Sequence, residues 1–506
     1  MKLVTKVIAY SLSALLLVLL VTIVRTIVYF PAPKEIDSCP DLHEPIAGSA
    51  VVDRFRAALR FKTITKAAHI YDTLELKRYI DWIIKSYPTI HSSPHVSYEL
   101  VNNYSLLYTV KGSDPSLKPY LLCGHLDVVP VELDKWDVDP FDGVIKDGFI
   151  YGRGTTDVKN IVMAAFESLE YLLKNGFKPK RGFYMAFGHD EEALGLDGAQ
   201  HLAKALESKG VSTLEYLLDE GTIILNKTFV GVDPIVALIG VTEKGYLTVR
   251  LTAKGAVGHS SMAPVDTAIT TLAKAVSKFE STVHPNMFGL GPEKDLFEAL
   301  APNANFPFNW LYSNLWLFGP IISRVLAAVP TSNGLVRTTS AVTIIGGGFK
   351  ENVLPSSASA IVNHRVHVKQ TIDEVLDFDR RLISDDRIEL TVEGMPIHPH
   401  PISPYDDNAF GYQIVKRSIR QVFNESVVVP GIMLANTDTR WYQHLTRAIY
   451  RFSPSVMYAE DTKRFHGHNE RIKVDNYLKT VNYYHHIIVN SDNKDIPDRP
   501  VVKDEL

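Results

Sequence analysis

Apolar and polar positions along the first half of the chain follow strand-like and helix-like patterns in turn. Short apolar runs, typical of buried strands, lie at 104–112, 118–129, 183–187 and 216–218. Apolar residues spaced by three and four positions predict two helices before these runs, at 51–61 and 71–88, and one between them, at 158–175. Strands that alternate with helices form largely parallel sheets, so this half of the chain predicts an α/β domain.

From about Glu243 the pattern changes. The stretch 246–261 alternates like a half-exposed strand. Further strands are expected at 343–345, 358–368 and 387–394, and helices at 269–279 and 373–383. Helices at 409–423 and 473–491 then resume the first pattern. We therefore predict a mostly parallel-sheet catalytic domain in two parts, 48–242 and 397–492, with an inserted α+β lid domain at 243–396.

An apolar, aromatic stretch of about 290–335 lies inside the predicted lid. Asn314, Pro320 and Arg324 interrupt it, which argues against a bilayer span. We interpret it as additional core of an enlarged lid. A wall for a lipid-like substrate and an interfacial surface are the alternatives.

Both ends of the chain carry targeting signals. An apolar run from Val7 to Val24, preceded by Lys2 and Lys6, predicts a cleaved signal peptide or an uncleaved signal-anchor over 1–29. A Pro-rich linker follows at 30–47, and the tail at 493–506 ends in Lys-Asp-Glu-Leu, the endoplasmic-reticulum retrieval signal. These features predict that the protein is located in the lumen of the endoplasmic reticulum or elsewhere in the secretory pathway, with the KDEL receptor as a partner. If the first segment is retained, it would also attach the protein to the membrane. Glycosylation sequons begin at Asn103, Asn226 and Asn424.

Composition narrows the possible chemistry. The 506 residues carry a formal charge of −4 with no basic stripe, so no nucleic-acid partner is expected. The only two cysteines are Cys39 and Cys123, which excludes a zinc site built on cysteines and makes a disulfide framework improbable.

Residues able to bind metal follow the predicted strands one after another. They are His125, Asp157, the adjacent Glu191 and Glu192, and Asp219. Parallel sheets bind ligands outside the carboxyl ends of their strands, so these side chains are expected to meet. Asp127 lies two positions after His125 and suits a carboxylate that orients the imidazole. Taken alone, Asp157 would be interpreted as a helix cap.

Six motifs in this order complete the pattern, namely GHLDVVP, GRGTTDVK, GHDEEALG, LLDEG, GAVGHSS and FHGHNER. Over 51–490 the chain resembles the aminoacylase/carboxypeptidase G family of two-zinc amidohydrolases, most closely its N-fatty-acyl-amino-acid synthase/hydrolase and carboxypeptidase S branch. The resemblance implies two zinc ions, with His125 and Asp219 on one, Glu192 and His466 on the other, and Asp157 bridging both. It also implies Glu191 as the general base and Asp127 as the orienting residue. His468 does not match a ligand position.

The same resemblance implies residues that bind substrate. His259 matches a lid histidine that stabilises the oxyanion, and Asn352 and Arg365 match positions that hold a carboxylate. Arg440 is a further candidate, with a salt bridge inside the domain as the alternative. Asn436 departs from the glycine common in the family.

The expected function is hydrolysis, or in reverse synthesis, of the amide bond of N-acyl amino acids, in particular N-fatty-acyl amino acids. A metallo-carboxypeptidase or dipeptidase acting on short peptides is the alternative, and an inactive lumenal zinc carrier is a third hypothesis. In this family the lid often dimerises, which implies a homodimer in which the lid histidine can act across chains.

Overall fold

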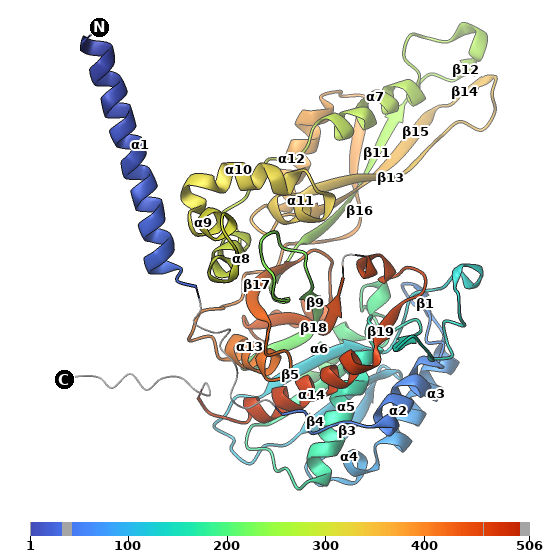
Figure 1. Cartoon of the computed structure of the whole chain (residues 1–506). Coiled ribbons are helices and arrows are strands. Elements are labelled where there is room, and N and C mark those ends of the chain that lie inside the picture. Colours follow the sequence, from blue (N-terminus) through green and yellow to red (C-terminus); the bar gives the residue numbers. More distant parts are fainter. Residues whose placement is uncertain (1, 33–42, 459, 496–506) are drawn as a thin grey trace.

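The computed structural model describes residues 2–32, 43–458 and 460–495. An eight-stranded sheet forms its centre, in the order β17-β10-β18-β9-β5-β8-β4-β3 (Figure 1). The strands are β3 (Val96–Val101), β4 (Ser105–Val110), β5 (Tyr120–His125), β8 (Phe183–Gly188), β9 (Leu217–Leu225), β10 (Val236–Glu243), β17 (Val427–Met433) and β18 (Ile449–Met457). Neighbours β18, β9, β5 and β8 run parallel, whereas β4 and β3 at one edge are antiparallel.

Helices cover both faces of this sheet, which explains why its strands read as continuous apolar runs. One face packs against α2 (Ser49–Leu59), α3 (Thr73–Ser86), α5 (Lys159–Lys174), α13 (Phe410–Val422) and α14 (Val474–Ser491). The other packs against α6 (Ala199–Ser208). Alternate residues of one strand serve the two cores: Leu106 and Tyr108 face the first, and Leu107 faces the second. The buried Cys123 is part of the second core.

A second, antiparallel sheet lies apart from the first, in the order β13-β15-β11-β16 (Figure 1). Its strands are β11 (Gly245–Lys254), β13 (Thr339–Gly347), β15 (Ser357–Val366) and β16 (Ile388–Ile397). Helices α7 (Ala268–Ser281) and α12 (Ile372–Ile383) share its core. A two-stranded pair, β12 (Gly258–His259) and β14 (Val353–Leu354), projects at the end farthest from the central sheet. This is the expected α+β lid.

The apolar stretch forms four short helices, here called the helical insert. They are α8 (Glu293–Leu300), α9 (Phe308–Ser313), α10 (Leu315–Ala327) and α11 (Pro330–Val336). Leu296 and Tyr312 of the insert share a core with Val236 of β10 and Val429 of β17. The helical insert therefore packs against β10 and β17, the two strands at one edge of the central sheet, and is not simply additional core of the lid.

The first helix, α1 (Lys2–Tyr29), extends from the body of the protein (Figure 1). Among the residues that the structure describes, it is the one helix long and apolar enough to cross a membrane. Part of the expected linker and the Lys-Asp-Glu-Leu tail lie outside the described residues.

Candidate metal centre

Segments far apart in the sequence bring potential metal ligands together at the carboxyl ends of the middle strands of the central sheet. His125 ends β5, Glu191 and Glu192 follow β8, Asp157 precedes α5, and His466 follows β18. Asp157 lies between two histidines: its Oδ1 is 3.3 Å from His125 Nε2, and its Oδ2 is 3.0 Å from His466 Nε2. Glu192 Oε2 is 3.1 Å from His466 Nε2. The two oxygens of Asp157 thus face two separate groups of donors, and Val158, not Asp157, is the N-cap of α5.

The structure places Glu220, and not the predicted Asp219, next to His125. Strand β9 does not end before Asp219 but continues to Leu225. Asp219 pairs with Arg451 of β18, yet the next pair is Thr222 with Phe452, so two residues of β9 form a bulge. The bulge directs Glu220 into the site, where its Oε1 is 3.3 Å from His125 Nε2.

Asp219 has a different partner. Its Oδ1 accepts the Glu220 backbone N–H at 2.9 Å, and its Oδ2 is buried with no hydrogen bond. Asp219 is also missing from the groups of potential ligand atoms that lie within 4.8 Å of one another, whereas Glu220 belongs to one of them. Glu220 therefore replaces Asp219 in the candidate ligand set.

The donor spacing fits two small divalent ions. In a tetrahedral zinc site with bonds of about 2.0–2.2 Å, neighbouring donor atoms are roughly 3.3–3.6 Å apart. His125 Nε2 is 3.3 Å from both Asp157 Oδ1 and Glu220 Oε1, which is within this range, and His466 Nε2 is 3.0 Å from Asp157 Oδ2 and 3.1 Å from Glu192 Oε2, slightly below it. Each histidine therefore has two carboxylates beside it, which gives the three nitrogen and oxygen donors that catalytic zinc sites use.

Several carboxylates share this site with little solvent. Burial raises the pKa of Glu192 to about 7, and the neighbouring Asp157 adds to this rise. Burial also raises the pKa of Glu220 to about 8 and that of Glu191 well above its ordinary value. Such a group of carboxylates is unfavourable unless cations compensate it, which agrees with a metal centre.

Asp127 contacts both the His125 imidazole and the loop that carries Glu191 and Glu192. His125 Nδ1 is 3.0 Å from the Asp127 backbone carbonyl, its hydrogen-bond partner, and 3.2 Å from an oxygen of the Asp127 carboxylate. The same carboxylate accepts the backbone N–H groups of Glu191, at 3.1 Å, and Glu192, at 3.3 Å. Because it fixes both the imidazole and the loop after β8, Asp127 suits the orienting role expected for it.

A buried ion pair that sequence patterns did not single out joins the other two loops. Arg153 Nη1 donates to Glu470 Oε2 at 2.8 Å, and Arg153 Nη2 donates to the His466 carbonyl at 3.2 Å. Glu470 also accepts the backbone N–H of Thr156 at 2.7 Å and of Asp157 at 3.3 Å. The pair therefore positions Asp157 and His466 relative to each other. The sequence did contain one indication of a role for Glu470, because it lies in the same FHGHNER motif as His466.

Of the predicted substrate residues, Arg440 lies beside this centre, and Arg365 is connected to the cavity lining through Asn436. Arg365 Nη1 donates to Asn436 Oδ1 at 2.7 Å, and Asn436 Nδ2 donates to Glu243 Oε1 at 3.0 Å. Arg440 Nη2 is 3.9 Å from Glu191 Oε1. Asn436, which departs from the family pattern, thus links Arg365 to the site.

The other two, His259 and Asn352, are at the far end of the lid. His259 is exposed in β12, and the Asn352 carbonyl accepts the Ser260 N–H at 3.1 Å. The structure does not bring these residues to the metal centre of the same chain (Figure 1).

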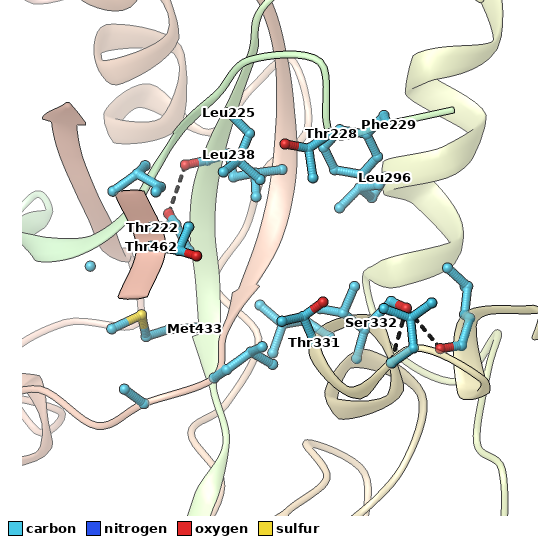
Figure 2. A pocket seen from close by; sticks show the side chains of 18 of the residues that line it. Thr222, Leu225, Thr228, Phe229, Leu238, Leu296, Thr331, Ser332, Met433 and Thr462 are labelled. Atoms are coloured by element: carbon cyan, nitrogen blue, oxygen red, sulfur yellow. Dashed lines mark hydrogen bonds between the residues drawn. The ribbon is translucent and has the colours of Figure 1, made fainter. Parts of the chain in front are cut away.

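A cavity of about 1000 Å³ extends from the metal centre into the helical insert. Asp157, Glu191, Glu192, Glu220 and His466 line its polar end. Farther along, the lining comes from β9, β10, β17 and the insert, including Leu225, Phe229, Leu238, Leu296, Phe297, Leu311, Ile322, Leu326 and Met433. Figure 2 shows Leu225, Leu238, Phe229 and Leu296 along one side of this wall.

A further group of potential ligands, His284, His364 and Asp379, is buried within the lid. His364 Nε2 is 2.9 Å from Asp379 Oδ2, and His284 Nε2 is 3.9 Å from Asp379 Oδ1. Burial lowers the pKa of His284 to about 3. None of the three lines the cavity.

Comparison with known proteins agrees with this geometry. A model of peptidase family M20/M25/M40 matches residues 121–490. The N-fatty-acyl-amino acid synthase/hydrolase of Xenopus tropicalis is 46% identical over 88% of this chain and 87% of its own length. The corresponding Mus musculus protein is 44% identical over 88% of each chain. Carboxypeptidase S of Saccharomyces cerevisiae is 31% identical over 89% of this chain and 85% of its own.

Solved structures share the fold at lower identity. An M20 family metallo-carboxypeptidase of Sulfolobus solfataricus has a TM-score of 0.64 and 18% identity, covering 87% of this chain and 99% of its own. Human carnosine dipeptidase 1 has a TM-score of 0.61 and 17% identity, with coverages of 88% and 96%. The predicted fold class is confirmed. Since the family model spans more than half of the sequence, the chain belongs to peptidase family M20/M25/M40.

Proposed function

We propose that this protein hydrolyses, and in reverse forms, the amide bond of N-fatty-acyl amino acids. The observation that carries this proposal is the apolar cavity that begins at the metal ligands and continues into the helical insert. Its volume of about 1000 Å³ is larger than a dipeptide needs and is at the upper end of the roughly 300–1,000 Å³ typical of ligand pockets. Five relatives that are 41–46% identical are named N-fatty-acyl-amino acid synthase/hydrolase, which supports the same substrate class, and one that is 41% identical is named a probable carboxypeptidase S-like protein.

The ligand set favours two zinc ions. His125 and Glu220 would hold one, Glu192 and His466 the other, and Asp157 would bridge them. Bound there, the two ions would supply a water activated at neutral pH and a Lewis acid for the amide carbonyl. This set differs from the sequence-based one only in Glu220.

Glu191 would act as the general base. Its carboxylate lines the polar end of the cavity, and its Oε2 is 4.0 Å from His125 Nε2, farther than the direct ligands. In this role Glu191 takes a proton from the attacking water and transfers it to the leaving nitrogen. Arg440, 3.9 Å away, helps to hold the Glu191 side chain in position.

The amino-acid carboxylate would bind near Arg365, whose planar guanidinium suits a bidentate contact. His259 and Asn352 are too remote to serve this site in their own chain. Strand β13 is an edge of the lid sheet, and Ile344 and Ile345 on it are exposed. We propose that the lids of two chains pair there, so that each His259 serves the partner's site.

The location we propose is the secretory pathway. Helix α1 has the length and composition of a membrane segment or signal. The Lys-Asp-Glu-Leu tail would return the chain to the endoplasmic reticulum, and Asn103, the first residue of one sequon, is exposed.

To test the proposal, purified full-length protein is incubated with N-oleoyl-phenylalanine and with a phenylalanine dipeptide, and free phenylalanine is measured. We expect turnover of the first, its loss on chelation, and recovery with zinc. Release from the dipeptide alone would establish the carboxypeptidase alternative.

The Glu191→Gln variant separates the base from the ligands. We expect it to retain two zinc ions per chain and to lose at least ~100-fold in kcat, the scale of general-base catalysis. Unchanged turnover would remove Glu191 from this role, and absence of turnover in the wild-type protein with bound zinc would favour the carrier hypothesis.

A further inference from the structure

We propose that the cavity opens toward the lipid bilayer through the outer face of α10, so that acyl chains enter from the membrane in which α1 is anchored. This inference rests on the proposed function and concerns how its substrate reaches the site. It commits to one occupant of the α10 face, a phospholipid bilayer.

Helix α1 is joined to the folded protein by a polar cluster at its last turns. Arg25 Nε donates to the Ser313 carbonyl at 2.7 Å, and the hydroxyls of Thr26 and Ser313 are 2.7 Å apart. Asn314 Nδ2 donates to the Thr22 carbonyl at 3.2 Å. Thr22, Ser313 and Asn314 are all fully buried. Removing α1 would leave Ser313 and Asn314 without these partners, which favours an anchor that is retained.

The position of α1 sets the level of the membrane. The uncharged segment from Val7 to Val24 has about 18 residues and a length of roughly 27 Å, close to the hydrocarbon thickness of about 30 Å. Lys2 and Lys6 at its start favour the cytoplasmic side for that end. The opposite end, where Thr22 and Arg25 contact α9 and the start of α10, then lies at the lumenal surface of the bilayer.

Helix α10 presents a largely apolar face to its surroundings at this level. Leu317, Ile321 and Val325, spaced by four residues, lie along one side of the helix and are all exposed. The exposed Arg324 interrupts this side, and its long side chain can place the charge among lipid headgroups. Trp316, in the first turn of the helix and away from this stripe, is 54% exposed. Tryptophan is enriched where membranes meet water, and exposed apolar stripes mark interaction surfaces.

The same helix lines the cavity. Ile321 and Val325 are lining residues, and so is Val329 just beyond the helix, yet these side chains are 59%, 64% and 51% exposed. A side chain that both lines a cavity and contacts the surroundings marks an opening. Here that opening is apolar, which suits a lipid chain and disfavours a route through water.

Leu317 allows a test because it belongs to the exposed stripe of α10 but does not line the cavity. Full-length protein is reconstituted in dioleoylphosphatidylcholine vesicles and assayed with vesicle-held N-oleoyl-phenylalanine and with water-soluble N-acetyl-phenylalanine. We expect Leu317→Glu to lower kcat/KM at least tenfold for the first and less than twofold for the second. Leu74→Glu is the matched control, since Leu74 on α3 is 66% exposed, and it should change neither rate by more than twofold.

A readout independent of activity uses a tryptophan introduced at position 317. In vesicles with brominated acyl chains, the emission that Leu317→Trp adds to that of the wild-type protein should be quenched by at least half. An unquenched signal, an equal loss of rate on both substrates, or no change on vesicle-held substrate would each overturn the proposal. So would conversion of a dimer to a monomer by Leu317→Glu, because a second copy would then cover α10. If wild-type protein cleaves neither substrate, the proposed function itself fails.

Discussion

The choice between Glu220 and Asp219 as a metal ligand can be decided with two isosteric substitutions. Glu220→Gln replaces the carboxylate whose Oε1 is 3.3 Å from His125 Nε2. Asp219→Asn changes its neighbour, which accepts the Glu220 backbone N–H. The two residues are adjacent and carry the same charge, so each variant is the control for the other.

The expected magnitudes follow from what each side chain contacts. Loss of a residue that only supports a ligand weakens metal binding by about 10–100-fold, so loss of the Glu220 carboxylate itself should exceed this range. We expect Glu220→Gln to retain one zinc ion per chain after dialysis instead of two. Asp219→Asn should retain two, because its Oδ1 still accepts the Glu220 N–H. Its buried Oδ2 becomes an amide nitrogen, which alters the free energy of unfolding by at most about 1–3 kcal/mol.

The assay is metal content by mass spectrometry after dialysis, with thermal unfolding measured in parallel. One ion in Asp219→Asn and two in Glu220→Gln would refute the reasoning, since the bulge of β9 would then not direct the ligand. Three ions in the wild-type protein would mean that His284, His364 and Asp379 also bind metal.

Three other predictions follow from the cavity and from two buried ion pairs. Each methylene added to the acyl chain should stabilise binding by about 0.8 kcal/mol, which raises kcat/KM roughly fourfold, until the cavity is full. A kcat/KM that stays the same from acetyl to oleoyl substrates would contradict an apolar cavity lining. Burial alone would raise the pKa of Glu243, but His400 and Arg451 outweigh it and lower that pKa to about 2. Because the folded-state pKa lies below the unfolded one, about 3 kcal/mol of stability should be present above pH ~4.5 and lost as pH falls toward 2, a slope that acid unfolding of Glu243→Gln should lack. Glu470→Gln should lower zinc retention at least ~10-fold, and Arg153→Met should do the same; full retention in both would show that this pair does not position Asp157.

The sequence was sufficient where one local pattern determines one element. The run 104–112 became β4, the spacing at 373–383 became α12, and the order of motifs placed His125, Asp157, Glu192 and His466 at one site. These features depend on periodicity and on chain order, both of which are visible in residues alone.

It was insufficient where a contact between distant strands decides the outcome. The bulge that turns Glu220 inward arises from the pairing of β9 with β18, more than 200 residues later. The helical insert joined the edge of the central sheet for a similar reason, through contacts with β10 and β17. Neither pairing leaves a mark on the periodicity of the segment concerned.

The pair of Arg153 and Glu470 also bears on when the enzyme becomes active during its synthesis. The loop with Asp157 leaves the ribosome early, but its partner is more than 300 residues away. A nascent or truncated chain that lacks the final segment has neither His466 nor Glu470, whose carboxylate pairs with Arg153 and accepts the Asp157 backbone N–H. The chain is therefore inert while it is being translated, and it gains hydrolytic power only when its last part folds back onto its first.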